Sequence, residues 1–202
     1  MRRQRVIKRQ IRVRPIKKKI YVFLEGKNSE PGYLETYSRL YPGVLAGLEL
    51  KRAQGVPATL VSKAVELKKT ISRRSYIEQN GKNDEIWVVC DRDAHPNYHQ
   101  SIAQAHSQGI KVAASNPCFE LWLILHFKEV DAALNHHEIQ SLCQKEVPGY
   151  QKRACKVPDL DKVIPLHRDA EERAKKLLSL RQADGAAAPM TTFHELLISI
   201  RS

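Results

Sequence analysis

Two short, uninterrupted apolar runs constrain the fold of this chain more than any other feature. They occupy residues 20–24 and 86–90, and both consist mainly of β-branched and aromatic residues. Such continuous runs are typical of strands that are buried on both faces of a parallel sheet. Because segments with helical periodicity separate the two runs, the sequence predicts an α/β fold with a mostly parallel sheet.

Weaker patterns add strands and helices to this sheet core, which is expected to span residues 20–115. Residues 47–52 and 110–114 are expected to bring the sheet to about four strands. The helices follow from the spacing of apolar residues and from the breakers at their ends. They are expected to start near Ser29, to run from Pro57 to near Asn80, and to run from residue 98 to 108.

Residues 116–202 show helical patterns only, so a helical C-terminal part is expected after the sheet. Asn116 followed by Pro117 is typical of an N-cap and a first helical residue. Thr192 with Glu195 predicts a capping box at the start of the last helix. The expected helices cover residues 118–127, 160–178 and 193–200, with a loop over residues 183–190.

Both strong strand predictions run directly into acidic residues. Glu25 follows the first run, and Asp91 and Asp93 follow the second. In an open parallel sheet, functional groups gather beyond the carboxyl ends of the strands, so these carboxylates are expected at one edge. Clustered carboxylates are typical ligands of Mg²⁺ or Mn²⁺, which offset their mutual repulsion. The alternative is that each acid is only a turn residue at a strand end.

Glu120 is a fourth candidate acid. It is expected in the first turn of the helix that follows Asn116, and that helix starts at the same edge of the sheet. The helix dipole favours a carboxylate at this position in any case, which is the structural alternative. The sequence therefore ranks Glu120 as a metal-site candidate below the other three acids.

Further polar residues lie close to these acids in the sequence. Lys27 and Glu30 follow Glu25, and His95 follows the Asp-x-Asp motif, so all three are candidate contacts to phosphate or substrate. A zinc pair of His95 and His99 is disfavoured because Pro96 argues against one helix through both. His126 lies on an apolar helix face and is expected to be a core residue.

Positive charge is concentrated at the N-terminus. The 202-residue chain has a formal net charge of +12, and its first 19 residues carry ten Lys or Arg and no acid. The division is therefore a basic arm over residues 1–19 and a nearly neutral domain over residues 20–202. A cationic arm is expected to contact the phosphate backbone of a nucleic acid. Its candidate contacts are Arg12, Arg14, Lys17, Lys18 and Lys19.

Two other interpretations of the arm stay open. It is either a solvated tail that keeps the protein soluble or an organellar transit peptide, although the absence of Ser weakens the second. No apolar run approaches the ~20 residues needed to span a bilayer, so a cytoplasmic protein without membrane contact is expected. The cysteines form no Cys-x-x-Cys pair and are expected to be reduced and buried.

Three segments of the sequence resemble the RloB family, which comprises Toprim-like proteins linked to restriction and abortive-infection loci and related to the AbiLii phage-resistance proteins. The resemblance covers nearly the whole chain. It departs from the family at residues 187–193, where a more polar turn is replaced and no role is assigned. The segments that carry it are residues 21–34, residues 88–93 and the long, unusual stretch of residues 115–127.

The resemblance implies a Toprim-like Rossmannoid domain that acts as a metal-dependent nuclease in antiviral defence. Glu25 matches the Toprim glutamate, which is thought to act as general acid or base. Asp91 and Asp93 match the metal-binding pair. A divalent ion neutralises phosphate charge and lowers the pKa of bound water, so Mg²⁺ or Mn²⁺ is the expected cofactor. DNA or RNA is the expected partner, and an ATPase encoded nearby is a second one.

Two other functional classes compete with the nuclease. A strand-end Asp-x-Asp is also used by nucleotide-sugar transferases and by phosphatases of the HAD type. The phosphatase is disfavoured because His95 stands where such enzymes have Thr or Val. The other alternative is a non-catalytic module that binds nucleic acid or an ATPase partner, in which the acids are only turn residues.

Overall fold

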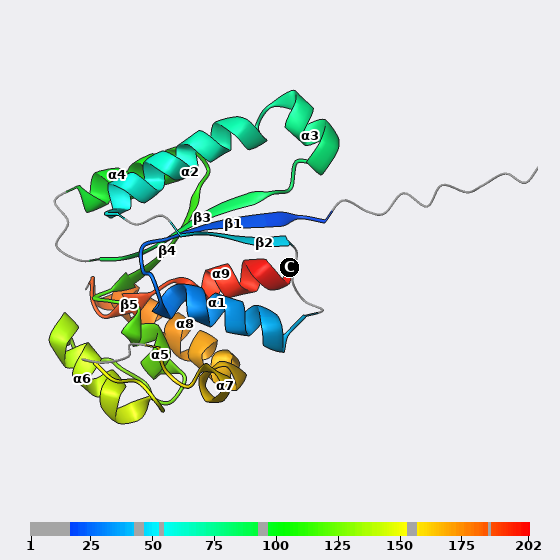
Figure 1. The fold of residues 1–202 in the computed structure, drawn as a ribbon. Coiled ribbons are helices and arrows are strands. Elements are labelled where there is room, and N and C mark those ends of the chain that lie inside the picture. The colour runs from blue at the N-terminus through cyan, green and yellow to red at the C-terminus, as the bar shows by residue number, and fades with distance from the viewer. Residues whose placement is uncertain (1–16, 43–46, 53–54, 93–96, 153–156, 186) are drawn as a thin grey trace, which may run out of the picture.

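A computed structural model describes residues 17–42, 47–52, 55–92, 97–152, 157–185 and 187–202 of the chain. Its centre is a five-stranded sheet in the order β2-β1-β3-β4-β5 (Figure 1). The first four strands are parallel, and β5 runs antiparallel to β4. The predicted α/β fold and its four strands are confirmed. The strands are β1 (Lys19–Leu24), β2 (Gly47–Arg52), β3 (Glu85–Asp91), β4 (Lys111–Asn116) and β5 (Met190–Thr191).

The central strands are apolar throughout because both of their faces are covered. In β1, Val22 and Leu24 belong to one hydrophobic cluster, whereas Tyr21 and Phe23 belong to a second one. Successive side chains of a strand point to opposite faces, so this division places one cluster on each side of the sheet. An apolar run without polar interruptions is thus required at this position.

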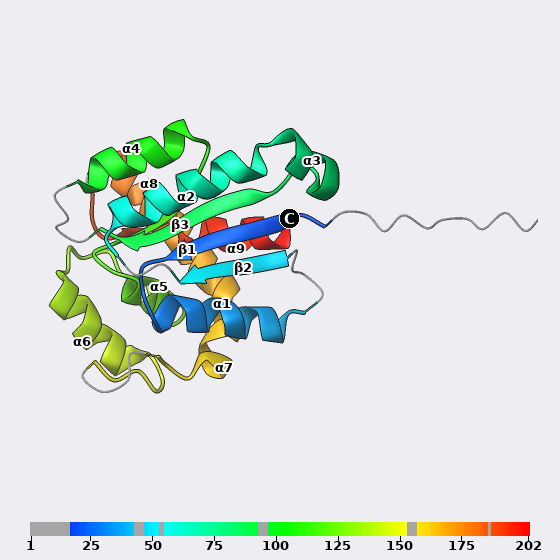
Figure 2. The ribbon, with the colours of Figure 1, turned by 45° about the horizontal axis from the view of Figure 1, so that its top comes forward.

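The helices form a layer on each face of the sheet (Figures 1 and 2). Helices α2 (Pro57–Ile71), α3 (Arg74–Asn80) and α4 (Tyr98–Ser107) lie on one side. The opposite side holds the C-terminal helices together with the helix that follows β1. These are α1 (Ser29–Leu40), α5 (Glu120–Leu125), α6 (His136–Glu146), α7 (Leu160–Val163), the 3₁₀ turn η1 (Ile164–Leu166), α8 (His167–Asp184) and α9 (Phe193–Arg201). The predicted helical C-terminal part is confirmed.

Two predicted helices are each divided in the structure. The helix expected from Pro57 to Asn80 ends at Ile71 and restarts at Arg74, because Arg73 between them is extended. Helix α3 buries none of its residues, so it has no apolar stripe from which the break could be read. The helix expected over residues 160–178 is interrupted at η1, where Pro165 lacks the N–H that a continuous helix needs.

Both predicted caps in the C-terminal part are wrong. Asn116 is the last residue of β4 and pairs with Met190, so the following helix begins only at Glu120. Thr192 makes no side-chain cap; instead its hydroxyl accepts a hydrogen bond from the N–H of Ala114, at 2.9 Å. The two-residue strand β5 holds Asn116 in the sheet by backbone pairing, whereas Thr192 is the N-cap residue of α9 but directs its hydroxyl to β4.

Because β1–β4 are parallel, these strands all begin at one end of the sheet and finish at the other. The carboxyl edge is where the parallel strands end, beside α5 and α6, and the amino edge is where they begin, beside α3 and the C-terminus (Figure 1). Among the described residues, no helix is both long enough and apolar enough to cross a membrane.

Candidate active site at the carboxyl edge

Glu25 and Asp91 lie at the ends of neighbouring strands, as the sequence predicts. The backbone N–H of Glu25 donates to the carbonyl of Val89 at 3.3 Å, which extends the pairing of β1 with β3 by one residue. Asp91 is the last residue of β3 and pairs with Ser115 of β4. Both acids are half-buried. Strand register therefore fixes the two backbones side by side at one edge.

Glu30 is a third acid of this edge and lies deeper than the first two. Its side chain is 7% exposed, and burial raises the pKa of its carboxyl group to about 7, with the charges of Glu120 and Glu25 acting in the same direction. The N–H groups of Glu30 and Gly26 oppose that shift. At neutral pH the Glu30 carboxyl group is therefore a mixture of its protonated and ionised forms.

Gly26 makes room for the Glu30 carboxyl group. A Cβ atom at residue 26 would lie 1.9 Å from Oε2 of Glu30, far inside van der Waals contact. A side chain at residue 26 would therefore displace the Glu30 carboxyl group from its position against the loop that follows β1. This contact keeps Glu30 beside Glu25 and away from open solvent, although the sequence suggested it as a substrate contact.

Glu120 is held by donors from three separate segments. It stands in the first turn of α5, as predicted, and its side chain is 6% exposed. Its Oε1 accepts hydrogen bonds from Tyr150 Oη at 2.7 Å and Gln140 Nε2 at 3.3 Å. The thiol of Cys118 is also hydrogen-bonded to its carboxylate. Neutral donors thus fix the orientation of this carboxylate within the described part of the site.

Two buried cysteines lie in the field of these acids. Burial raises the pKa of the Cys90 thiol, and Glu25 and Asp91 raise it further. The pKa of Cys118 is raised in the same way by burial and then by Glu120 and Asp91. Asp91 acts on both thiols, so it lies between the acid at the end of β1 and the acid of α5 in its electrostatic influence. Both thiols stay protonated at neutral pH, which makes them unsuitable as nucleophiles.

The carboxylate oxygens at this edge are ligands of the kind that Mg²⁺ binds. Carboxylate oxygens are its preferred protein ligands, and it is commonly held by only one or two of them, together with water and substrate phosphates. Among the described residues, no group of three or more His, Cys, Asp or Glu side chains is arranged to hold a metal ion. The chemistry fits a magnesium site of the open type and does not fit a closed cage built from these residues.

Several predicted site residues lie elsewhere or outside the described ranges. Lys27 is exposed on the loop that follows Glu25. His99 is exposed on α4, and its Nε2 lies 3.3 Å from Nη2 of Arg92. The remaining predicted contacts at this point fall outside the described residues. These are Asp93, His95, Arg12 and Arg14.

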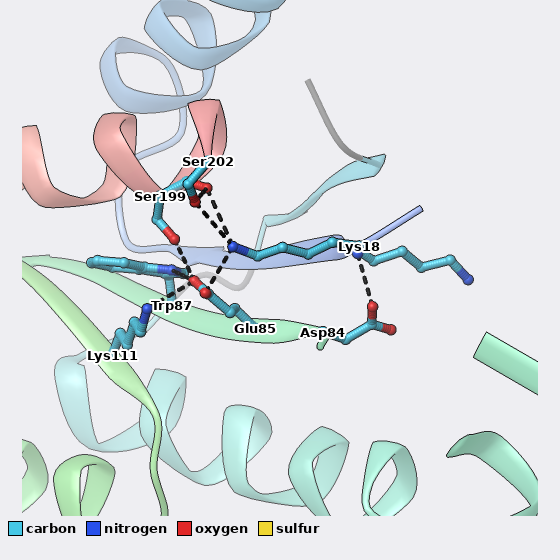
Figure 3. Close-up of polar contacts among 8 residues, drawn as sticks. Lys18, Asp84, Glu85, Trp87, Lys111, Ser199 and Ser202 are labelled. Carbon is cyan, nitrogen blue, oxygen red and sulfur yellow. Dashed lines mark hydrogen bonds and ion pairs between the residues drawn. The ribbon is translucent and has the colours of Figure 1, made fainter. Parts of the chain in front are cut away.

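The three lysines at the base of the basic arm are at the amino edge. Lys17 is exposed, whereas the ammonium group of Lys18 forms an ion pair with Glu85 at 2.8 Å (Figure 3). Lys19 begins β1, and its Nζ donates to Oδ1 of Asn80 at 3.0 Å. Lys18 and Lys19, two of the predicted phosphate contacts, are therefore bound to other residues of the fold, at the amino edge and not at the edge that holds the acids.

Glu85 is the centre of a network at this edge. It also accepts from Trp87 Nε1 at 3.0 Å, from Lys111 at 3.0 Å and from the hydroxyl of Ser199 (Figure 3). Its partial burial alone would raise the pKa, but these hydrogen bonds and the one from Lys18 outweigh it and lower the pKa to about 2. The network joins β3, β4 and α9 to the start of β1.

His126 is a core residue, as predicted. It is 1% exposed, with Nδ1 2.9 Å from the carbonyl of Trp122 and Nε2 2.9 Å from the hydroxyl of Tyr33. Because a carbonyl only accepts, Nδ1 carries the proton and Tyr33 donates to Nε2. Burial lowers the pKa of His126 to about 3, so it stays neutral.

Sequence reasoning missed Gln140 and Tyr150 as parts of this site. Both lie in the helical C-terminal part, 20 and 30 residues beyond the Glu120 to which they donate. Neither residue stands in a motif that points to an acid. Cys118 is different, because it lies two residues before Glu120 in the same unusual stretch, and this spacing was a usable signal.

The comparisons with known proteins identify one family for this chain. The model of the RloB-like protein family matches residues 20–200, which is nearly the whole chain after the basic arm. The searches of curated proteins and of solved structures give no match. The matched region includes every described acid of the carboxyl edge as well as the helical C-terminal part. The chain belongs to the RloB-like family.

Proposed function

We propose that this chain is a Mg²⁺- or Mn²⁺-dependent nuclease of the Toprim type that acts on DNA or RNA in antiviral defence. The observation that carries the proposal is the pairing of β1 with β3, which sets the backbones of Glu25 and Asp91 close together at the carboxyl edge, with the Glu30 carboxyl group packed against the loop after Glu25. Gathered acids are unfavourable for folding, and a functional site is the usual reason for retaining them. Such a nuclease would act in the cytoplasm, on nucleic acid that enters the cell.

In this proposal Asp91, Asp93 and Glu120 hold the metal ion. The ion supplies neutralisation of phosphate charge and a lower pKa for bound water. Glu120 suits this role because Tyr150 and Gln140 keep its carboxylate in one orientation. Preorganised ligands avoid the cost of ordering a flexible side chain when the ion binds.

Glu25 would move the proton. As general base its carboxylate takes a proton from the attacking water, and as general acid it returns that proton to the departing sugar oxygen. Glu30 limits the charge beside it, because a carboxyl group with a pKa near 7 is ionised only in part at neutral pH. Lys27 lies on the same loop and would contact a phosphate next to the one that is cleaved.

Cleavage assays test this function directly. The full chain is incubated with plasmid DNA and with total RNA, in Mg²⁺ or Mn²⁺, beside the variants Asp91→Asn and Glu25→Gln. Cleavage by the unaltered chain that both variants lose is expected. Asp161→Asn is the matched control, since Asp161 is exposed on α7 and forms its ion pair with Arg39 in the last turn of α1. Activity that persists in Asp91→Asn would contradict the proposal.

A second candidate is a non-catalytic module that binds nucleic acid or a partner ATPase. It is favoured by the hydrogen bonding of Glu120, because a carboxylate held by Tyr150 and Gln140 also serves to join α5 to α6. Isothermal titration with Mg²⁺ and Mn²⁺ separates the two candidates. Binding that Asp91→Asn weakens supports the nuclease, and the absence of any binding supports the module.

A further inference from the structure

Four cations at the amino edge, of which Lys17, Arg73 and Lys82 are exposed and Lys68 is half-buried, have no part in the candidate active site. Lys68 lies in the last turn of α2, Arg73 lies between α2 and α3, and Lys82 follows α3. Lys17 precedes β1 at the same edge. Among the described residues, none of these four side chains forms an ion pair with an acid, so no described acid neutralises their charges directly.

Contacts between β1 and the segment after α3 bring these cations together. The N–H of Lys19 donates to Oδ1 of Asp84 at 2.8 Å, and Nζ of Lys19 donates to Asn80. Lys68, Lys82 and Asp84 line one small surface depression of about 130 Å³. Figures 1 and 2 both place α3 beside the start of β1. The base of the basic arm and the corner between α2 and α3 therefore form one surface, called here the amino-edge surface.

Neighbouring acids leave this surface positive. Glu66 and Glu78 are paired with Lys69 and Arg74, and Glu85 is paired with Lys18 and Lys111. Asp84 accepts hydrogen bonds from Tyr76 and from the N–H of Lys19. The four cations without an ion-pair partner thus add to the charge of the arm, whose first 16 residues carry seven more Lys or Arg.

The local chemistry favours a polyanion over a small anion. The depression lies near the C-terminal ends of α2 and α3, where the helix dipoles are negative, and it contains the Asp84 carboxylate. An isolated phosphate entering it would be repelled. A chain of phosphates can instead contact the exposed Lys17, Arg73 and Lys82 without entering the depression, and each such contact releases a counterion.

We propose that the amino-edge surface, formed by Lys17, Lys68, Arg73 and Lys82, binds the phosphate backbone of a nucleic acid. The surface lies at the amino end of the strands and the acids lie at the carboxyl end, so the surface would hold the polymer at a distance from the point of cleavage. This inference rests on the proposed function only in taking nucleic acid as the ligand, and it requires no catalysis.

Salt-dependent binding tests the surface in the full chain. Fluorescence anisotropy is measured with a labelled 20-nucleotide single strand and a 20-base-pair duplex, in EDTA, over a range of NaCl concentrations. The variant is Lys68→Gln/Lys82→Gln. The control is Lys145→Gln/Lys175→Gln, which removes the same charge from exposed positions of α6 and α8. Neither substituted lysine of the variant has a side-chain hydrogen bond or ion pair within the described structure, so folding is expected to be retained, as circular dichroism will show.

Two lost phosphate contacts reduce the slope of log K against log salt by roughly 1.8 for the duplex or roughly 1.4 for the single strand. The control is expected to keep the slope of the unaltered chain. An unchanged slope in the variant, or an equal loss in the control, would overturn the surface and leave the nuclease proposal standing. A reduced slope without cleavage in Mg²⁺ would support the surface and count against the nuclease. Failure of the unaltered chain to bind either oligonucleotide would overturn both, and an acidic protein would then fit these cations.

Discussion

The pKa of a glutamate is shifted in opposite directions at the two edges of the sheet. At the carboxyl edge, burial and the nearby Glu25 and Glu120 raise the pKa of Glu30 to about 7. At the amino edge, the hydrogen bonds of Lys18, Ser199, Trp87 and Lys111 overcome partial burial and lower the pKa of Glu85 to about 2. Hydrogen bonds thus fail to offset the effect of burial on the pKa where chemistry is proposed, and they outweigh it where the glutamate joins structural elements.

This contrast gives a way to separate function from stability. An acid of the carboxyl edge costs folding energy because it repels its neighbours, and its removal is expected to impair activity more than folding. An acid of the amino edge contributes folding energy through its partners, and its removal is expected to impair folding more than activity. Substitutions that remove charge and keep shape test the difference most directly.

The largest effect is expected from Glu25→Gln. If Glu25 moves the proton, the cleavage rate falls by roughly 10²–10⁴-fold, which is the usual contribution of general acid–base catalysis. The midpoint of urea unfolding should change little. Glu85→Gln is the paired control and should cleave at the normal rate wherever it is folded. A Glu25→Gln chain that cleaves at the normal rate would show that Glu25 does not move the proton.

The pH dependence of stability should carry opposite signs for the two acids. Glu30 binds its proton more tightly when folded, so stability falls as pH rises from 4.5 to about 7, by roughly 3 kcal/mol. Glu85 binds its proton less tightly when folded, so its contribution is present above pH 4.5 and is lost as pH falls toward 2.

Urea unfolding at a series of pH values, without divalent ions, checks both signs. Glu30→Gln should flatten the curve between pH 4.5 and 7 and leave the acid limb in place. Glu85→Gln should flatten the acid limb alone. Identical curves for the two variants would show that the edges do not differ as described.

A smaller effect is expected from Glu85→Gln at neutral pH. The variant keeps the shape of the side chain but weakens its contacts with Lys18 and Lys111, so the free energy of unfolding should fall by about 2 kcal/mol. Glu66→Gln removes an exposed ion pair with Lys69 and should cost less than about 0.5 kcal/mol. Equal losses in the two variants would mean that the amino-edge network is no stronger than a surface pair.

The smallest effect is expected from Tyr150→Phe. One buried hydrogen bond to Glu120 is lost while that from Gln140 remains, so the free energy of unfolding should fall by about 1 kcal/mol. Affinity for Mg²⁺ should weaken as well if Glu120 is a ligand. Tyr41→Phe serves as the control, because the Tyr41 ring packs against Tyr37 and its hydroxyl has no hydrogen bond within the described structure.

The sequence predicted the parts of this fold that depend on local pattern. Continuous apolar runs located β1 and β3, and the acids that follow them came with those strands. Strand β5 was missed because two residues are too short to form a pattern, and its pairing with β4 keeps Asn116 in a strand where a helix cap was predicted. Local pattern therefore located the apolar strands, but it did not show where two of the predicted helices are interrupted.

The candidate site was predictable only as far as strand ends could place it. Tyr150 and Gln140 reach Glu120 through the packing of α6 and the loop after it, which no spacing in the sequence reveals. Lys18 was assigned to nucleic acid because it stands in a basic run, yet its partner Glu85 lies 67 positions further along. Charge composition identified the arm but did not show where the arm ends and the fold begins.

The attachment of Lys18 also determines how a mechanical load would pass through the molecule. Lys18 contacts Glu85 of β3 and both Ser199 and Ser202 at the end of α9 (Figure 3). The next residue begins β1, which is hydrogen-bonded to a parallel strand on each side. A pull on the arm by a tethered polymer would act along β1 and shear both ladders at once, while α9 shares the force. Lys18 and the two ladders of β1 would thus resist a force applied to the arm.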